Sequence, residues 1–180
     1  MKNKKWARAS VSIAARVCRE VVGAEVGCHA GAMSRELLRA IPRLTLFMVD
    51  RWQPYSDAER AEFPKSIIVQ TTYKKKWKRI KEQANLVADG YDRAYTIEGD
   101  SVEAAATIDD GSLDFVFIDS DHSYEGAKRE NAAWIPKLKP GGWLMGYDYG
   151  DNRDAEVTRA VAELGEPVTR DTRFIWAVQF

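Results

Sequence analysis

Two aspartates and a histidine lie close together at Asp119, Asp121 and His122, directly after the most apolar stretch of the chain. Carboxyl and imidazole groups are the side chains that most often move protons near neutral pH. Asp121 or His122 could therefore act as a general base. The structural alternative is that residues from Asp119 to Ser123 cap a helix that begins near Tyr124.

A second set of candidates surrounds a glycine-containing turn, in which three residues separate Gly27 from Gly31. Glycine permits a tight turn and the close approach of a ligand to the following helix, although a turn required for shape alone would use it equally. The spacing departs from G-x-G-x-x-G, so it would serve a dinucleotide pyrophosphate less well. Glu25 inside the turn would repel a diphosphate and could bind an ammonium group. His29 is more typical of a turn residue than of a catalyst.

Asp50 ends the next apolar stretch, where an acid in nucleotide-binding folds accepts both hydroxyls of a ribose. As a single residue it could equally cap a helix or face solvent. Because a helix of suitable length joins it to the turn at Gly27, the pair indicates a nucleoside site.

The pattern of apolar residues predicts alternating strands and helices that place these candidates at strand ends. Strands are expected at residues 21–27, 44–49, 94–97, 113–118, 143–147, 167–169 and 174–180. Helices are expected at 6–20, 34–41 with Ser34 as its N-cap, about 73–87, a short one after 101, 124–138 and 154–164. The last two strands are too close for a parallel crossover, so they must be antiparallel if they pair. These elements predict an α/β sandwich with a mainly parallel sheet.

Three further segments carry expectations of their own. Residues 1–21 should contain an amphipathic helix packed on the domain, and residues 51–72 lack a clean period and form a candidate lid. The basic run at 74–81 would either bind an anionic partner or form the solvated face of a helix that buries Trp77. The solvated face is favoured.

Composition restricts the class of protein. The chain of 180 residues is expected to be a single domain over 1–180, and its 27 Lys and Arg residues balance its 27 Asp and Glu residues. No global charge therefore attracts nucleic acid or membrane. Cys18 and Cys28 lack a metal-type spacing, and no apolar run suits a bilayer span or a signal peptide. We expect a cytoplasmic protein, and the sequence does not indicate its oligomeric state.

Five segments together resemble the class I S-adenosylmethionine-dependent methyltransferases, and among them the small-molecule O-methyltransferases of the macrocin and catechol type, which are similar to methyltransferase family 24. The segments are A-E-V-G-C-H-A-G (24–31), F-M-V-D-R-W (47–52), I-E-G-D-S (97–101), F-I-D-S-D-H-S-Y (117–124) and L-K-P-G-G-W-L-M-G-Y-D-Y (138–149). The resemblance runs over residues 22–180. It implies a Rossmann-like three-layer sandwich whose seven-stranded sheet is mostly parallel with the last strand antiparallel.

The resemblance also implies a cofactor, S-adenosyl-L-methionine, and an acceptor, a small molecule such as a sugar or phenol with a free hydroxyl. The implied cofactor-binding residues are Glu25, Gly27, His29 and Gly31 near the methionine part, Asp50 and Arg51 near the ribose, Asp100 and Ser101 at the adenine end, and Asp119 at the sulfonium. The expected catalytic residues are Asp121 and His122, because methylating a hydroxyl requires the loss of its proton.

Metal-using relatives bind a divalent cation through an acid in the loop after one strand and two acid or amide residues after the next strand. Asp119 and Asp148 match two of these positions, but Tyr147 occupies the third and is a poor magnesium ligand. A magnesium site at Asp119 and Asp148 is therefore an open alternative.

Three other functions stay open at this stage. They are a cofactor-binding protein without turnover, a nucleotide-dependent oxidoreductase, and a nucleic-acid methyltransferase that uses the basic run. Glu25 and the antiparallel closing pair weigh against the oxidoreductase.

Overall fold

The computed structural model describes residues 20–62, 76–150, 155–170 and 175–180. Seven strands form one sheet in the order β3-β2-β1-β4-β5-β7-β6. The strands are β1 (Val21–Val26), β2 (Leu44–Asp50), β3 (Ala94–Glu98), β4 (Leu113–Ile118), β5 (Leu138–Gly146), β6 (Thr169–Arg170) and β7 (Trp176–Gln179). Strands β1 to β5 run parallel, and β7 is antiparallel to both β5 and β6. The predicted fold class, including the antiparallel closing pair, is confirmed.

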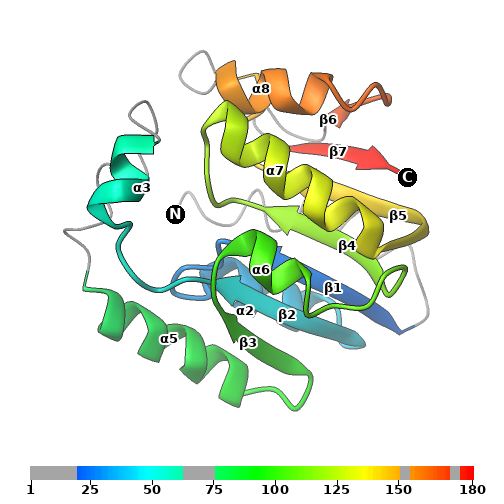
Figure 1. Cartoon of the computed structure of the whole chain (residues 1–180). Coiled ribbons are helices and arrows are strands. Elements are labelled where there is room, and N and C mark those ends of the chain that lie inside the picture. The colour runs from blue at the N-terminus through cyan, green and yellow to red at the C-terminus, as the bar shows by residue number, and fades with distance from the viewer. Residues whose placement is uncertain (1–19, 63–75, 151–154, 171–174) are drawn as a thin grey trace.

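Helices cover both faces of this sheet and make a three-layer sandwich. They are α2 (Ala32–Ala40), α3 (Asp57–Glu62), α5 (Trp77–Asp89), α6 (Ser101–Ala105), α7 (Tyr124–Trp134), the 3-10 turn η2 (Ile135–Lys137) and α8 (Ala155–Ala162). Figure 1 shows α6 and α7 in front of the sheet and α2 behind it. One core cluster joins α2 and α5 to the sheet through residues such as Leu37 and Ala84, and a second joins α6, α7 and α8 through residues such as Ala104, Trp134 and Val161.

Strand β4 is the centre of the sheet and is buried along its whole length. This burial explains its almost unbroken apolar sequence, because a parallel strand covered by helices on both faces has no solvent side. The exception is Asp114, whose carboxylate accepts hydrogen bonds from the backbone N–H of Val22 at 2.9 Å and from Lys139 Nζ at 2.8 Å. A buried acid on the central strand therefore ties together the beginnings of β1 and β5.

The helix expected at residues 34–41 begins two residues earlier than predicted, at Ala32, and Ser34 is not its N-cap. Gly31 occupies that position with a left-handed backbone, and no side chain caps the helix. Ser34 lies inside α2 with a fully buried side chain. Its hydroxyl donates to Glu25, so a residue that resembled a cap by type is a buried contact between α2 and β1.

The helix expected at 124–138 is also shorter than predicted. It ends at Trp134, passes through η2, and gives way at Leu138 to strand β5. The strand expected at 143–147 also begins earlier: β5 starts at Leu138, continues through the Pro-Gly-Gly sequence at 140–142 as an irregularity in its pairing with β4, and ends at Gly146. A bulge of this kind absorbs extra residues without ending a strand.

Two predicted segments lie largely outside the described residues. Of the expected N-terminal helix at 1–21, the structure describes only residues 20 and 21, and Val21 begins β1. The candidate lid at 51–72 contains a short helix, α3, and its residues from 63 onward are not described. Among the helices that are described, none has the length and apolar character needed to cross a bilayer.

Lys139→Met should destabilise the protein by about 1–3 kcal/mol, because the buried Asp114 carboxylate loses the hydrogen bond from this ammonium group. Urea unfolding monitored by circular dichroism measures the change. The matched control is Lys128→Met, which removes an exposed ion pair with Glu163 and should have little effect. Equal stability of Lys139→Met and the wild type would show that the buried pair contributes nothing.

Candidate functional site

A cavity of about 330 Å³ lies at the carboxyl ends of β1 to β4. This is the edge at which open parallel sheets bind ligands. Eleven residues had been predicted as cofactor-binding or catalytic, and nine of them line it: Gly27, His29, Asp50, Arg51, Asp100, Ser101, Asp119, Asp121 and His122. The other two, Glu25 and Gly31, are not among its lining residues, so the structure brings most of the predicted site residues together at one edge of the sheet.

The turn after β1 is shaped by the strand beside it. Gly27 has φ of 85°, and a Cβ at this position would lie 2.2 Å from the backbone oxygen of Asp119. Any side chain would therefore push the loops after β1 and β4 apart. The glycine is required for shape, and that shape brings the two loops together along the cavity.

Glu25 lies behind the cavity wall, with only 3% of its surface exposed. Its carboxyl accepts a hydrogen bond from the hydroxyl of Ser34. Burial raises the pKa of Glu25 to about 8, against the lowering effect of the Ser34 hydrogen bond, and the negative charges of Asp119 and Asp50 raise it further. In this structure the carboxyl contacts α2 rather than the cavity, so direct capture of an ammonium group by Glu25 is not supported.

Asp50 presents its carboxylate between the loops after β1 and β2. One oxygen accepts the backbone N–H of His29 at 2.9 Å, and the other accepts that of Trp52 at 2.8 Å. The indole N–H of Trp52 in turn donates to the carbonyl of His29 at 2.7 Å. Each carboxylate oxygen can accept a further hydrogen bond, and the side chain lines the cavity, so Asp50 is suited to a pair of neighbouring hydroxyls.

Asp100 and Ser101 form the opposite rim, where β3 leads into α6. The Asp100 carboxylate caps α6 by accepting the N–H of Val102 at 2.9 Å. The Ser101 hydroxyl oxygen accepts the indole N–H of Trp134 at 3.0 Å. Both predicted residues therefore have structural roles and also face the cavity.

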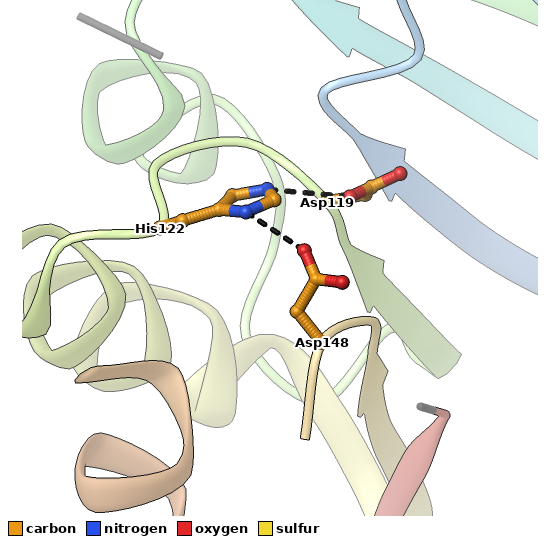
Figure 2. A group of neighbouring side chains, drawn as sticks. All are labelled: Asp119, His122 and Asp148. Atoms are coloured by element: carbon orange, nitrogen blue, oxygen red, sulfur yellow. Dashed lines mark ion pairs between the residues drawn. The ribbon is translucent and has the colours of Figure 1, made fainter. Parts of the chain in front are cut away.

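His122 lies between two carboxylates, as Figure 2 shows. Its Nδ1 is 2.8 Å from Asp148 Oδ2, and its Nε2 is 3.4 Å from Asp119 Oδ1. Burial by itself would lower the pKa of His122, but the hydrogen bonds and charges of Asp119 and Asp148 outweigh burial and raise that pKa to about 10. An imidazole that is already protonated at neutral pH cannot accept a proton, so the geometry does not support His122 as the general base.

The donor atoms of Asp119, His122 and Asp148 all lie within 4.8 Å of one another. The structure therefore brings the two predicted metal ligands together, with an imidazole between them. Magnesium prefers a shell of oxygen ligands, whereas an imidazole stands between these two carboxylates. The Tyr147 side chain packs against the core. These residues do not fit a magnesium ion.

Asp121 is the remaining candidate for a base. Its side chain lines the cavity although it is 8% exposed, and one carboxyl oxygen accepts the N–H of Ser123 at 2.9 Å. The other carboxyl oxygen lies against Gly126, where an added Cβ would be 2.2 Å away. The backbone N–H of Ser123 and the space left by Gly126 thus fix the position of this carboxyl.

Ten lining residues were not among the predicted site residues, and they include Tyr55, Trp77, Arg129 and Glu130. Arg51 stacks on the ring of Tyr55, 4.0 Å from its centroid, and burial raises the pKa of the Tyr55 hydroxyl. Trp77 meets the ring of His29 edge-on at 6.2 Å. The aromatic residue among the lysines was a usable signal for Trp77, whereas nothing in the sequence distinguished Glu130 from a solvated helix residue.

The basic run is described only from residue 76 onward, and Lys74 and Lys75 lie outside the described residues. Lys76, Lys78 and Arg79 are exposed at the start of α5, and Lys81 pairs with Glu98. This arrangement agrees with the solvated helix face that the sequence favoured.

The sequence matches the model of a protein family described as a methyltransferase domain, over residues 24–149. The matched region contains every residue that lines the cavity. No curated protein matches the chain.

Solved structures share the fold at low sequence identity. The O-methyltransferase NovP is 18% identical, with a TM-score of 0.62 over 95% of this chain and 75% of its own. CalS11, a TDP-rhamnose 3'-O-methyltransferase of calicheamicin biosynthesis, is 12% identical, with a TM-score of 0.65 over 99% of this chain and 80% of its own. Precorrin 8w decarboxylase from Methanobacterium thermoautotrophicum is 17% identical, with a TM-score of 0.62 over 97% of this chain and 89% of its own. At these identities the likeness shows the fold alone.

The wild type should lose stability as the pH rises because Glu25 titrates. The variant Glu25→Gln should not show this loss. A carboxyl whose pKa is raised from 4.5 to about 8 on folding contributes its full stability below pH 4.5 and loses it as the pH rises through 8. The amide does not titrate, so the variant should gain on the wild type by on the order of 3 kcal/mol between pH 5 and pH 9. Urea unfolding at several pH values measures this difference.

The control for that experiment is Glu36→Gln, which changes a half-exposed residue of the same helix as Ser34. Its unfolding free energy should follow that of the wild type at every pH. Parallel curves for Glu25→Gln and the wild type would show that folding does not raise the pKa of Glu25.

Proposed function

The chain belongs to the methyltransferase domain family and is a class I S-adenosylmethionine-dependent methyltransferase, and we propose that it transfers the methyl group to a hydroxyl oxygen of a small molecule. The position of the Asp50 carboxylate carries this proposal. Backbone N–H groups at the rim of the cavity fix both of its oxygens in position. Each oxygen can accept one more hydrogen bond, which suits the two hydroxyls of a ribose.

The cavity also fits the remaining parts of the cofactor in size and polarity. A volume of about 330 Å³ is within the range of small-molecule sites. With the ribose at Asp50, the base would lie toward Asp100 and Ser101, and the sulfonium toward the carboxylate of Asp119. An anionic side chain at that end favours a positively charged sulfur over a neutral one.

An oxygen acceptor is supported by the carboxyl of Asp121, which faces the cavity beside Asp119. S-adenosylmethionine supplies an activated methyl group on sulfur. Asp121 accepts the hydroxyl proton as the new C–O bond forms and the C–S bond breaks, which leaves a methyl ether and S-adenosylhomocysteine. Positioning of the two reactants is the main contribution of the protein to the rate. Two neighbours of the same fold, NovP and CalS11, are themselves O-methyltransferases.

No step of this mechanism uses a metal ion, because the donor set at Asp119, His122 and Asp148 does not fit magnesium. His122 instead carries one positive charge between the two carboxylates that flank it, so this end of the cavity keeps a net negative charge. Asp121, which lines the cavity beside Asp119, is the acid that we assign to the acceptor.

We also propose the cytoplasm as the compartment. Cys28 is a buried free thiol, which accords with a reducing environment.

Calorimetric titration with S-adenosylhomocysteine tests the function most directly. The wild type should bind it, and Asp50→Ala and Asp119→Ala should each bind it about 10 to 100 times more weakly, because each loses a charge-assisted contact. Asp89→Ala is the control, since this exposed acid ends α5 and does not line the cavity. Unchanged affinity in both cavity variants would overturn the site.

Asp121→Asn should lower kcat at least about 100-fold while it leaves the affinity for S-adenosylhomocysteine nearly unchanged. The assay measures S-adenosylhomocysteine released with a panel of sugars and phenols. Gly126→Ala should lower kcat less severely, because its methyl group would displace the Asp121 carboxyl without removing it. Gly90→Ala is the matched control, since its Cβ would make only ordinary contacts. Full turnover by Asp121→Asn would exclude it as the base.

A further inference from the structure

Two carboxylates from neighbouring strands meet at one end of the cavity, and a histidine ring lies between them (Figure 2). Asp119 directly follows β4, Asp148 follows β5, and these two strands pair in parallel. The ligand atoms of the two acids and of His122 all lie within 4.8 Å of one another. Two carboxylates at this distance repel each other, because a partly buried site screens their charges weakly. A positive charge between them therefore stabilises the arrangement.

The backbone fixes the positions from which these three side chains start. The N–H of Tyr147 donates to the carbonyl of the last residue of β4 at 3.3 Å, which ties the loop after β5 to the end of β4. Asp148 has φ of 66°, a left-handed conformation that persists only where the surrounding structure holds it. On the other side of the site, the Asp121 carboxylate accepts the N–H of Ser123, whose hydroxyl caps α7. The loop that carries His122 is therefore held in place as well.

The ring of His122 presents one nitrogen to each acid. Its Nδ1 lies 2.8 Å from Asp148 Oδ2, and its Nε2 lies 3.4 Å from Asp119 Oδ1. An ionised carboxylate only accepts hydrogen bonds, and a neutral imidazole has a single N–H, so only the imidazolium can donate to both acids. A magnesium ion joins ligand oxygens that are at most about 4.2 Å apart, twice its bond length to oxygen. The ring therefore fills the space that such an ion would need.

We propose that His122 takes the place of a divalent cation at this site, as a positioning residue that holds Asp119 and Asp148 together and makes the site independent of metal. An imidazolium carries one charge, whereas magnesium carries two. The acids therefore keep a net negative charge, which favours the positively charged sulfur that we propose lies at Asp119. This effect on the cofactor rests on the proposed function, but the exclusion of a cation does not.

His122→Ala tests this role because it removes the internal cation and leaves both acids in place. The space between the acids then suits Mn²⁺, which prefers carboxylate oxygens as magnesium does. The electron paramagnetic resonance signal of free Mn²⁺ measures the bound fraction during a titration. His122→Ala should bind one Mn²⁺ with a Kd on the order of 0.1 mM, and the wild type should bind it at least about tenfold more weakly.

Two controls locate the bound ion. The double variant His122→Ala, Asp148→Asn lacks one of the two charged ligands and should lose the Mn²⁺ binding. His29→Ala removes the other of the 2 histidines of the chain, which lines the same cavity, and should bind Mn²⁺ as weakly as the wild type. If His122→Ala does not fold without metal, His122→Asn replaces it, since an amide oxygen is also a suitable ligand.

Rescue by the ion distinguishes positioning from packing. In EDTA, His122→Ala should bind S-adenosylhomocysteine about tenfold more weakly than the wild type does, because Asp119 loses its charged partner. Excess Mn²⁺ should restore most of this affinity, whereas the affinity of the wild type should respond to neither EDTA nor Mn²⁺. A histidine needed only for packing would give a loss that Mn²⁺ does not restore. Calorimetric titration measures these affinities.

The outcomes separate this inference from the proposed function. The role of His122 is overturned if neither of its variants binds Mn²⁺, if the wild type binds Mn²⁺ as tightly as they do, or if Mn²⁺ does not restore the affinity for S-adenosylhomocysteine. A wild type that binds no S-adenosylhomocysteine overturns the proposed function, and the Mn²⁺ titration still decides whether His122 excludes a cation.

Discussion

The contact between the loops after β1 and β4 is the constraint on which the site depends. These strands are neighbours in the sheet, and the strand order reverses between them. Gly27 brings its backbone against the backbone oxygen of Asp119. One loop leads toward Asp50, where we propose that the ribose binds, and the other carries Asp119 and Asp121, which we propose face the reacting atoms. The distance between cofactor and chemistry is therefore set by two backbones in contact rather than by flexible side chains.

The site is also built around acids that are costly to bury. Glu25, Glu130 and Asp148 are each less than a tenth exposed, and each has a specific neighbour: a serine hydroxyl for the two glutamates and an imidazolium for the aspartate. Burial of this kind reduces stability at neutral pH. Its concentration around one cavity is typical of a functional site, where groups with shifted pKa values gather.

The sequence predicted the fold and most of the cavity because both follow from local rules. Apolar stretches of strand length alternate with helical periods, and polar residues that follow parallel strands meet at one edge, so Asp50, Asp119 and Asp121 could be located from their positions alone. Glu25 could not be placed, because an acid within a strand faces one side of the sheet or the other according to what packs there. The role of His122 depended on Asp148, which another strand delivers. Glu130 required knowing which face of α7 turns inward.

The part of the cavity around Asp50, where we propose that the ribose binds, is shaped by hydrogen bonds within the fold. His29 and Trp52 have left-handed backbones, with φ of 51° and 44°, and hydrogen bonds to Asp50 and to each other hold them there. Folding, rather than ligand binding, offsets the strain of such conformations. A rigid binding site for the ribose contacts only a part of the cofactor that is the same before and after methyl transfer. With the ribose bound as we propose, spent cofactor fits this site as well as fresh cofactor does, so we expect inhibition by the product, with the charge on sulfur as the main difference between the two.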